Sequence, residues 1–534
     1  MPTNPLSPDV DYGDNPLVQA PSWAQAGAWH LQNLRDTWQA MQDAETWKEA
    51  ARQYGNAMLM GSIAPSAHGA GLEFRLNPDA PGFADRVSTR LTGTKAVPGD
   101  MHTTPDNLVG MDSFNAAEKN DYQQKTAANI AYHPGFERFK DNLGITTPDE
   151  IHNAFVDHIA GNLRALYDAV PDEWKPGAML WYDGGNKLAT DLSSNYGMQP
   201  RQGAAVYATL SPQTRWDENV EMGNRVTDIV KNHSDTPMTQ AMRDLYAREY
   251  EGTSNGENWK DNWDRISKPT NDDGTPLTLN DITNRNDTGL WVRLYDEAHA
   301  DHHNFRIVNP DGTLGDWALT KDKSGLDSFG WNNNTTIGNA VSVIRDGSLE
   351  NISRALGDAH KVRNFYNNLV SPNAGSDVTI DTHAIAAANL LPWGSSRPEV
   401  SYGLGSGVNA AKFRTGLDDP YPTTPAAGVG NGSLGLYPVY AEAYRRVAAD
   451  LGILPRQLQS VTWEGIRGLY DDADRRNPRL LGSTSDLWRA FENGQANAAD
   501  TRAELLGRGI PAPDWTAGGG VAGTPWQRPY SGGD

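Results

Sequence analysis

The segment LGDAHKVRNFYNNLVSPNAGSDVTIDTHAIAAA, residues 356–388, carries the most informative pattern of the chain. Around Gly357 the sequence predicts a helix that stops at this glycine and a second helix that starts directly after it. Further along, three β-favouring residues precede Asp381, and the alanine-rich run after it predicts another helix. Asp381 is therefore expected at a helix N-terminus, where its carboxylate accepts backbone N–H bonds.

Each feature of this segment has a structural explanation as well as a functional one. Free N–H groups at the helix start after Gly357 suit a phosphate oxygen, but the pattern also suits a plain helix–helix turn. Asp381 suits the stabilisation of a cationic sugar, but capping a helix is a common use of aspartate. In the same way, LSPQT (210–214) either presents Gln213 to a ligand or uses Ser211 as a helix cap.

The flanking sequence predicts more helices and few strands. Residues at offsets of three and four between Ile151 and Leu166 mark the buried face of a helix that begins near Thr147. Helical patterns are predicted over 23–60, 147–170, 204–232, 337–370 (broken at Gly347 and Gly357), 378–391 and 437–470. We therefore predict a mainly α fold with long irregular loops.

Composition divides the chain into five parts. They are an N-terminal arm, helix and loop-rich region (1–146), the first part of a helical domain (147–232), an inserted polar segment (233–336), the second part of that domain (337–470) and a Gly/Pro-rich C-terminal tail (471–534). Within the first part of the domain, WYDGGNK (181–187) predicts a turn.

Charge and cysteine content exclude several classes of protein. Lys plus Arg number 46 and Asp plus Glu 67, so the net charge of −21 argues against DNA binding by bulk charge, although it leaves room for a local basic groove. The chain has no cysteine, which excludes disulfides, cysteine–zinc sites and iron–sulfur clusters. Neither a signal peptide nor a membrane span is predicted. The 17 tryptophans suit core packing better than base stacking.

A cluster of histidines and carboxylates was weighed as a metal site. It comprises Asp296, Glu297, His299, His302 and His303. On a helix, Asp296, His299 and His303 share a face, but Ala300 stands where a zincin motif has glutamate. A solvated helix end is the preferred interpretation, and we predict neither a metal nor a cofactor.

Three motifs, read in order, resemble those of the helix-hairpin-helix DNA glycosylases. LSPQTRWDENVEMG (210–223) resembles the family's LSxQT helix, LGDAHKV (356–362) its hairpin, and VTIDTHAIAAA (378–388) its VDTH segment. The resemblance covers about residues 200–400. The flanking sequence, including the helix at 440–463, also resembles uncharacterised glycosylase-like proteins of tailed bacteriophages.

The resemblance implies a set of site residues. Asp381 matches the catalytic aspartate, and Lys361 best matches the lysine that forms a Schiff base with the sugar. Gln213 matches the glutamine near the gap left by the flipped base, and His383 is assigned to positioning. The resemblance also places Gly357, Thr382 and Asn219 among the substrate-binding residues.

Several positions depart from the family pattern. Lys361 lies 20 positions before Asp381, slightly wider than the family spacing, and Arg363 occupies the strict position. An arginine cannot lose its proton to become a nucleophile. The second hairpin glycine is replaced by Ala359, with Asp358 beside it, and Ala386 stands where arginine often follows the DTH motif. These changes indicate a diverged member of the family.

The resulting expectation is a DNA base-processing protein of bacteriophage type, in the cytoplasm of an infected bacterium. It would cleave the N-glycosidic bond, with or without strand cleavage, or take part in hypermodification of thymine or hydroxymethyluracil. The alternative is a non-enzymatic virion or assembly component that binds other phage structural proteins and keeps an inactive glycosylase-like fold. A basic stripe beside Asp381 would favour the enzyme, and an acidic cleft the structural role.

Overall fold

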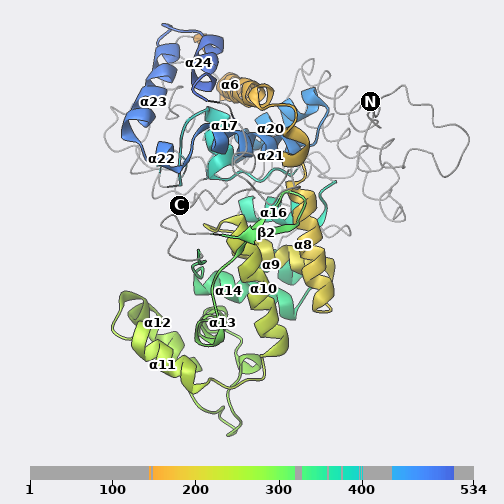
Figure 1. Ribbon diagram of the computed structural model, residues 1–534, viewed down its shortest axis with the longest axis vertical. Coiled ribbons are helices and arrows are strands. Elements are labelled where there is room, and N and C mark those ends of the chain that lie inside the picture. Colours follow the sequence, from red (N-terminus) through yellow and green to blue (C-terminus); the bar gives the residue numbers. More distant parts are fainter. Residues whose placement is uncertain are drawn as a thin grey trace, which may run out of the picture.

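The computed structural model describes residues 143–145, 148–318, 327–357, 360–373, 377–395, 397, 400, 404, 436–509 and 511. In these ranges the protein is mostly helical, which confirms the predicted mainly α fold. The described helices form two lobes, lower and upper in Figure 1, each with its own hydrophobic core. The predictions made for residues 1–142 lie outside the described residues.

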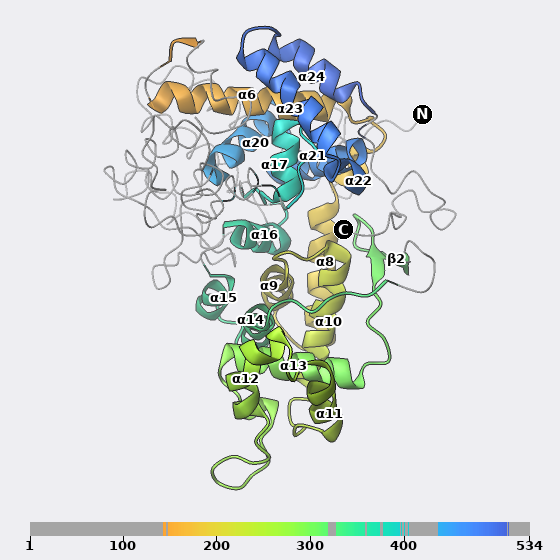
Figure 2. The same cartoon turned by 90° about the vertical axis from the view of Figure 1, so that its left-hand side faces the viewer.

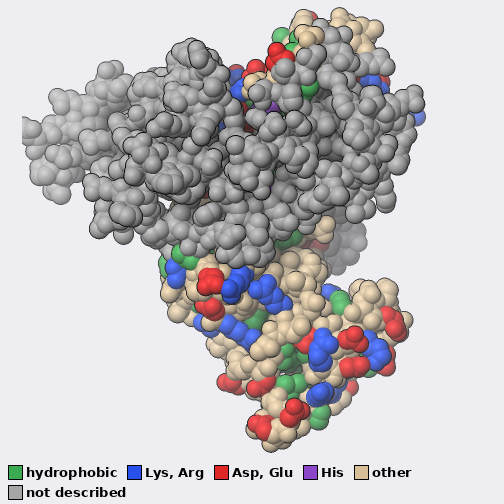
Figure 3. Space-filling model, turned by 180° about the vertical axis from the view of Figure 1, so that it is seen from behind, with side chains coloured by type: hydrophobic (Ala, Val, Ile, Leu, Met, Phe, Trp, Pro, Cys, Tyr) green, Lys and Arg blue, Asp and Glu red, His purple; other side chains and the backbone are tan. Residues whose placement is uncertain are grey.

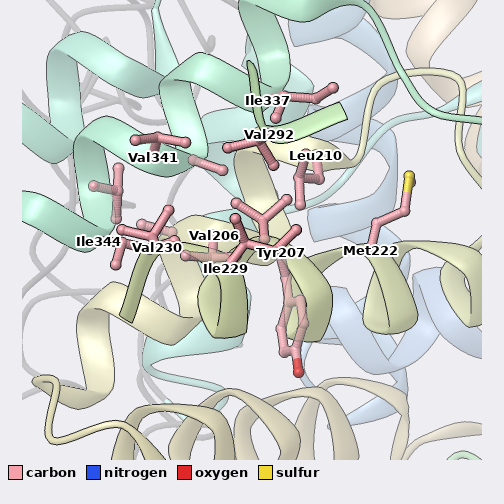
Figure 4. Close-up of a cluster of buried hydrophobic side chains, with 14 of the residues drawn as sticks. Val206, Tyr207, Leu210, Met222, Ile229, Val230, Val292, Ile337, Val341 and Ile344 are labelled. Atoms are coloured by element: carbon pink, nitrogen blue, oxygen red, sulfur yellow. The ribbon is translucent and has the colours of Figure 1, made fainter. Parts of the chain in front are cut away.

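The lower lobe is formed by residues 181–370. Its elements are α8 (Trp181–Asn195), α9 (Pro200–Leu210), α10 (Trp216–Asn232), α11 (Gln240–Glu249), α12 (Ser254–Ile266), η2 (Leu279–Asp281), α13 (Arg285–His299), β1 (Arg306–Val308), β2 (Leu314–Trp317), α14 (Asn334–Arg345), α15 (Leu349–Leu356) and α16 (His360–Val370). Aliphatic side chains from four of these helices meet in the core, as Figure 4 shows for Val206, Ile229, Val292 and Val341.

The upper lobe joins segments from both sides of the lower one. It contains α6 (Pro148–Ala169), α17 (Thr382–Asn389), α20 (Tyr437–Leu451), α21 (Pro455–Leu469), α22 (Asp472–Arg475), α23 (Pro478–Glu492) and α24 (Ala498–Leu506). The predicted apolar face of α6 is buried in its core: Ile151, Phe155, Ile159, Leu163 and Leu166 are at most 8% exposed. The short helix α7 (Lys175–Ala178) lies in the connection from α6 to the lower lobe.

The boundary between the lobes differs from the predicted division of the chain. The segment 233–336 does not stand apart as an insertion, because α13 packs extensively on α14 and Leu290, Trp291 and Leu294 are fully buried in the lower core. The chain instead changes lobe between α16 and α17, inside the predicted second part of the domain (337–470). Polar residues flank the apolar positions of α13 in the sequence, so composition alone did not indicate that this helix is buried.

The C-terminal region also differs from its prediction as a Gly/Pro-rich tail. Residues 472–506 form α22, α23 and α24, and Trp488, Phe491 and Leu505 are buried in the upper core. Only residues 507–509 and 511 of the remaining tail belong to the described part.

The predicted turn WYDGGNK is the first half of α8. Its glycines serve close packing. A Cβ at Gly184 would lie 2.2 Å from the carbonyl oxygen of Pro310, in the turn between β1 and β2. These strands pair antiparallel, with Val308 opposite Leu314. Gly184 thus allows the hairpin to contact the helix backbone directly, whereas a Cβ at Gly185 would lie 2.5 Å from Cδ2 of Leu369. Turn statistics reveal neither role.

Candidate functional site

Lys361 lies in the first turn of α16 and reaches the end of α9. Its Nζ donates hydrogen bonds to the carbonyl oxygen and to Oγ of Ser211, both at 2.9 Å. The ammonium also lies 5.3 Å from the centre of the Phe365 ring. The side chain is half-buried. Lys361 is therefore held in one orientation by the first residue of the SPQT turn.

The electrostatic setting of Lys361 is unusual for a lysine. Burial lowers the pKa of its ammonium from 10.5 to about 8, and the carboxylate of Asp381 partly offsets this effect. Asp381 therefore acts on Lys361 directly, although the two residues belong to different lobes. Figure 2 shows their helices, α16 and α17, at the junction of the lobes.

Asp381 is the N-cap of α17, as the sequence predicts. Its Oδ1 accepts a hydrogen bond from the backbone N–H of Ala384 at 2.8 Å. Its Oδ2 accepts the indole N–H of Trp463, on α21, at 3.0 Å. The side chain is half-buried. The capping bond uses only Oδ1, so a role of Asp381 as helix cap does not exclude a role of its carboxylate in stabilising a cationic sugar.

Gln213 lies at the tip of the turn between α9 and α10. Its φ of 57° places it in the left-handed region, and its side chain is exposed. The amide of Asn332 holds this turn by donating to the carbonyl oxygens of Leu210 (3.1 Å) and Pro212 (3.0 Å) and to Oγ1 of Thr214 (3.0 Å). Asn332 was not predicted as part of the site, and its only sequence signal is the Asn run before α14.

Arg363, at the strict family spacing, points into the hairpin. Its guanidinium is fully buried and donates to the carbonyl of Gly357 (2.6 Å) and to the carbonyl and Oγ of Ser353 (3.2 and 2.9 Å). Gly357 itself has a φ of 64°, which favours glycine, and it ends α15. Arg363 therefore fastens the helix–glycine–helix unit, and the amine that interacts electrostatically with Asp381 is that of Lys361. Asp358 and Ala359 lie outside the described residues.

The other predicted substrate-binding residues divide into two groups. Thr382 and His383 lie in the first turn of α17, half-buried, and the His383 ring meets the Trp463 ring edge-on at 5.5 Å. Asn219, in contrast, is 1% exposed, and its Nδ2 donates to the carbonyl of Tyr207 at 2.9 Å. Asn219 thus joins α10 to α9, and its burial removes it from contact with a substrate.

The first turn of α8 connects the lower lobe to α21 of the upper lobe. Trp181 donates its indole N–H to Glu464 at 2.8 Å, and its ring packs edge-on against Trp463 at 6.0 Å. Tyr182 donates its hydroxyl to Oε1 of Gln459 at 2.8 Å. These contacts anchor the helix that carries Trp463, the indole partner of Asp381. None of these residues was predicted as part of the site.

The histidine–carboxylate cluster is not the solvated helix end that the sequence predicts, because its Asp296 is enclosed in a network of hydrogen bonds and ion pairs. Asp296 is buried and accepts hydrogen bonds from Arg225 (3.1 Å), His303 (2.8 Å) and Trp331 (3.2 Å), while α13 ends at His299. Among the described residues, no group of three His, Cys, Asp or Glu side chains is arranged to hold a metal ion. Likewise, none of the helices in the described ranges combines the length and apolar character of a bilayer span.

Charge on the lower lobe is of mixed sign. Figure 3 shows Lys and Arg side chains interspersed with Asp and Glu on its rear face. At the candidate site, positive charge comes from Lys361 and from Arg467, whose guanidinium lies 4.4 Å from the centre of the Trp463 ring. On the rear face of the lower lobe, carboxylates thus accompany the cationic side chains.

Residues 147–259 match a family of unknown function (DUF7178). The matched range runs from the start of α6 into α12, so it includes Ser211 and Gln213 but neither Lys361 nor Asp381. No curated protein and no solved structure matches the chain.

Proposed function

We propose that this protein processes bases in DNA through a glycosylase-type site, with Lys361 as the amine nucleophile and Asp381 as the carboxylate. The observation that carries the proposal is a buried amine on Ser211 that is electrostatically coupled to the carboxylate of Asp381. An amine with a pKa of about 8 lies within the electrostatic reach of a helix-capping carboxylate. Perturbed titratable groups of this kind concentrate at functional sites.

The chemistry follows from the protonation state of Lys361. With a pKa of about 8, about a tenth of the lysine is neutral at pH 7, far more than for an ordinary lysine. The neutral amine attacks C1′ of the sugar while the base departs with the electrons of the glycosidic bond. The Asp381 carboxylate stabilises the positive charge that develops on the sugar. The new secondary ammonium gives one proton to the departing base and its second to O4′ as the C1′–O4′ bond breaks, which leaves a neutral imine. Loss of a C2′ proton from the imine then expels the 3′-phosphate and cleaves the strand.

Lys361 must leave Ser211 before it attacks, because both acceptors on Ser211 engage its Nζ. A substrate sugar placed between Lys361 and Asp381 would replace these contacts. The exposed Gln213 on the same turn is then available to contact the DNA near the displaced base.

The test of Lys361 is borohydride trapping on duplex DNA that contains an abasic site. Wild type should form a covalent adduct, and Lys361→Ala should lose it. Lys187→Ala is the matched control, because Lys187 is an exposed lysine of α8 that pairs with Asp191. The absence of an adduct with wild type would refute the role of Lys361.

The test of Asp381 is base release from duplexes that carry modified pyrimidines. Asp381→Asn should abolish release and leave the fold intact, because asparagine is a good helix cap. Thermal unfolding of the variant checks the fold. Full base release by Asp381→Asn would remove this carboxylate from the mechanism.

A further inference from the structure

The carboxylate of Asp381 is oriented from outside its own helix. Its Oδ1 is fixed by the N-cap bond to Ala384, which any capping aspartate makes. Its Oδ2 is bonded by the indole N–H of Trp463, which lies 82 residues further along the chain. A cap alone leaves the second oxygen without a defined partner, so Trp463 determines how the carboxylate is rotated.

The indole of Trp463 is itself held on three sides. The guanidinium of Arg467 lies over its ring at 4.4 Å, one turn along α21. The rings of Trp181 and His383 pack edge-on against it at 6.0 and 5.5 Å. A cation over the ring draws electron density from the indole, which makes its N–H a better donor to a carboxylate.

We propose that Trp463 is a positioning residue for Asp381: its indole N–H, held by Arg467 and by Trp181 of the opposite lobe, aims the carboxylate at the sugar that Lys361 attacks. This inference rests on the proposed function, because it assigns Trp463 a part in the same reaction. It also gives the junction of the lobes a role, since Trp181 on α8 and Trp463 on α21 make the contact there.

The substitution that isolates the N–H is Trp463→Phe, which keeps an aromatic ring and removes the donor. Trp488→Phe is the matched control: it removes an indole bond to the other end of α17, from Trp488 to the carbonyl of Asn389 at 2.9 Å. Single-turnover base release from duplexes that carry modified pyrimidines should slow about tenfold or more in Trp463→Phe, with the DNA concentration at half-maximal rate unchanged. Trp488→Phe should release the base at the wild-type rate.

A double-mutant cycle separates positioning from general support of the fold. If Trp463 acts through Asp381, Trp463→Phe slows the residual single-turnover base release of Asp381→Asn no further. An additive loss, or a wild-type rate in Trp463→Phe alone, overturns the inference.

A second measurement does not depend on activity. In protein labelled with ¹⁵N-tryptophan, the indole resonance that disappears in Trp463→Phe should move upfield in Asp381→Asn, because the carboxylate acceptor is lost. An unmoved resonance overturns the inference while leaving the proposed function intact. If wild type traps no DNA, the proposed function fails, and a shifted resonance then shows a purely structural bond.

Discussion

Raising the pH from 7 to 10 is expected to stabilise the protein through Lys361. Its pKa in the folded state is about 8 because the ammonium is buried, whereas in the unfolded chain it returns to about 10.5. Between these values the unfolded chain binds more protons than the folded one, so the free energy of unfolding rises with pH. The gain in the free energy of unfolding is small at pH 7 and grows to about 2–3 kcal/mol at pH 10.

The variant Lys361→Met isolates this contribution, because other titrating groups cancel when the two proteins are compared at the same pH. Urea unfolding at pH 7 and at pH 10 gives the free energy of unfolding of each protein. The free energy of unfolding of wild type, relative to that of Lys361→Met, should rise by about 2–3 kcal/mol between the two pH values. Lys260→Met is the control, since Asp264 raises the pKa of the exposed Lys260 and the ammonium stays protonated over this range.

Competitive labelling with acetic anhydride measures the same titration directly. The labelled fraction of Lys361, scaled to its plateau, should reach half near pH 8, while Lys260 should reach half above pH 10. If Lys361 titrates with Lys260, or if the stability difference from Lys361→Met stays constant with pH, the reasoning about its burial is refuted.

Three further substitutions test the supports of the site. Asn332→Ala should cost about 1–3 kcal/mol of stability and slow trapping, because the turn that holds Lys361 loses the hydrogen bonds of the Asn332 amide. The control is Asn333→Ala, which removes the N-cap of α14 and should cost about 1 kcal/mol without slowing trapping. Arg363→Met should cost about 3 kcal/mol in chemical denaturation, since buried acceptors on the hairpin lose their donor, and a loss below about 1 kcal/mol would contradict this role. Gln213→Gly should raise stability by about 1 kcal/mol by relieving the left-handed backbone, and should weaken DNA binding in a filter or fluorescence assay; unchanged binding would exclude a DNA contact by the Gln213 amide.

Local sequence features determined the helices. The apolar spacing from Ile151 to Leu166 predicted α6, the glycines at 347 and 357 separated α14, α15 and α16, and Asp381 was predicted as the N-cap of α17. Each of these signals acts within about one helical turn, through capping bonds and the period of side chains around a helix. These helices can therefore be predicted from short stretches of sequence, without knowledge of the rest of the chain.

The same local signals misled where glycines or polar residues serve distant contacts. The Gly184–Gly185 pair suggested a turn, but Gly184 allows a β-hairpin to approach α8. Segment 233–336 suggested an insertion, but its Trp291 is fully buried in the lower core. The hairpin lies more than 100 residues from Gly184, and α14, on which α13 packs, lies more than 40 residues from Trp291. The sequence near Gly184 and Trp291 does not record these partners.

The site itself was decided by the tertiary structure. Lys361 and Asp381 were named from the sequence by resemblance, but what surrounds them was not. Lys361 meets Ser211 across 150 residues, and Asp381 meets Trp463 across 82. Burial sets the pKa of Lys361, and this burial exists only once α16 has packed against α9 and the turn that carries Ser211. Residue types and helix positions follow from short stretches of the sequence. The desolvation of Lys361 and the orientation of the Asp381 carboxylate, in contrast, arise from the packing of segments that lie far apart in the sequence.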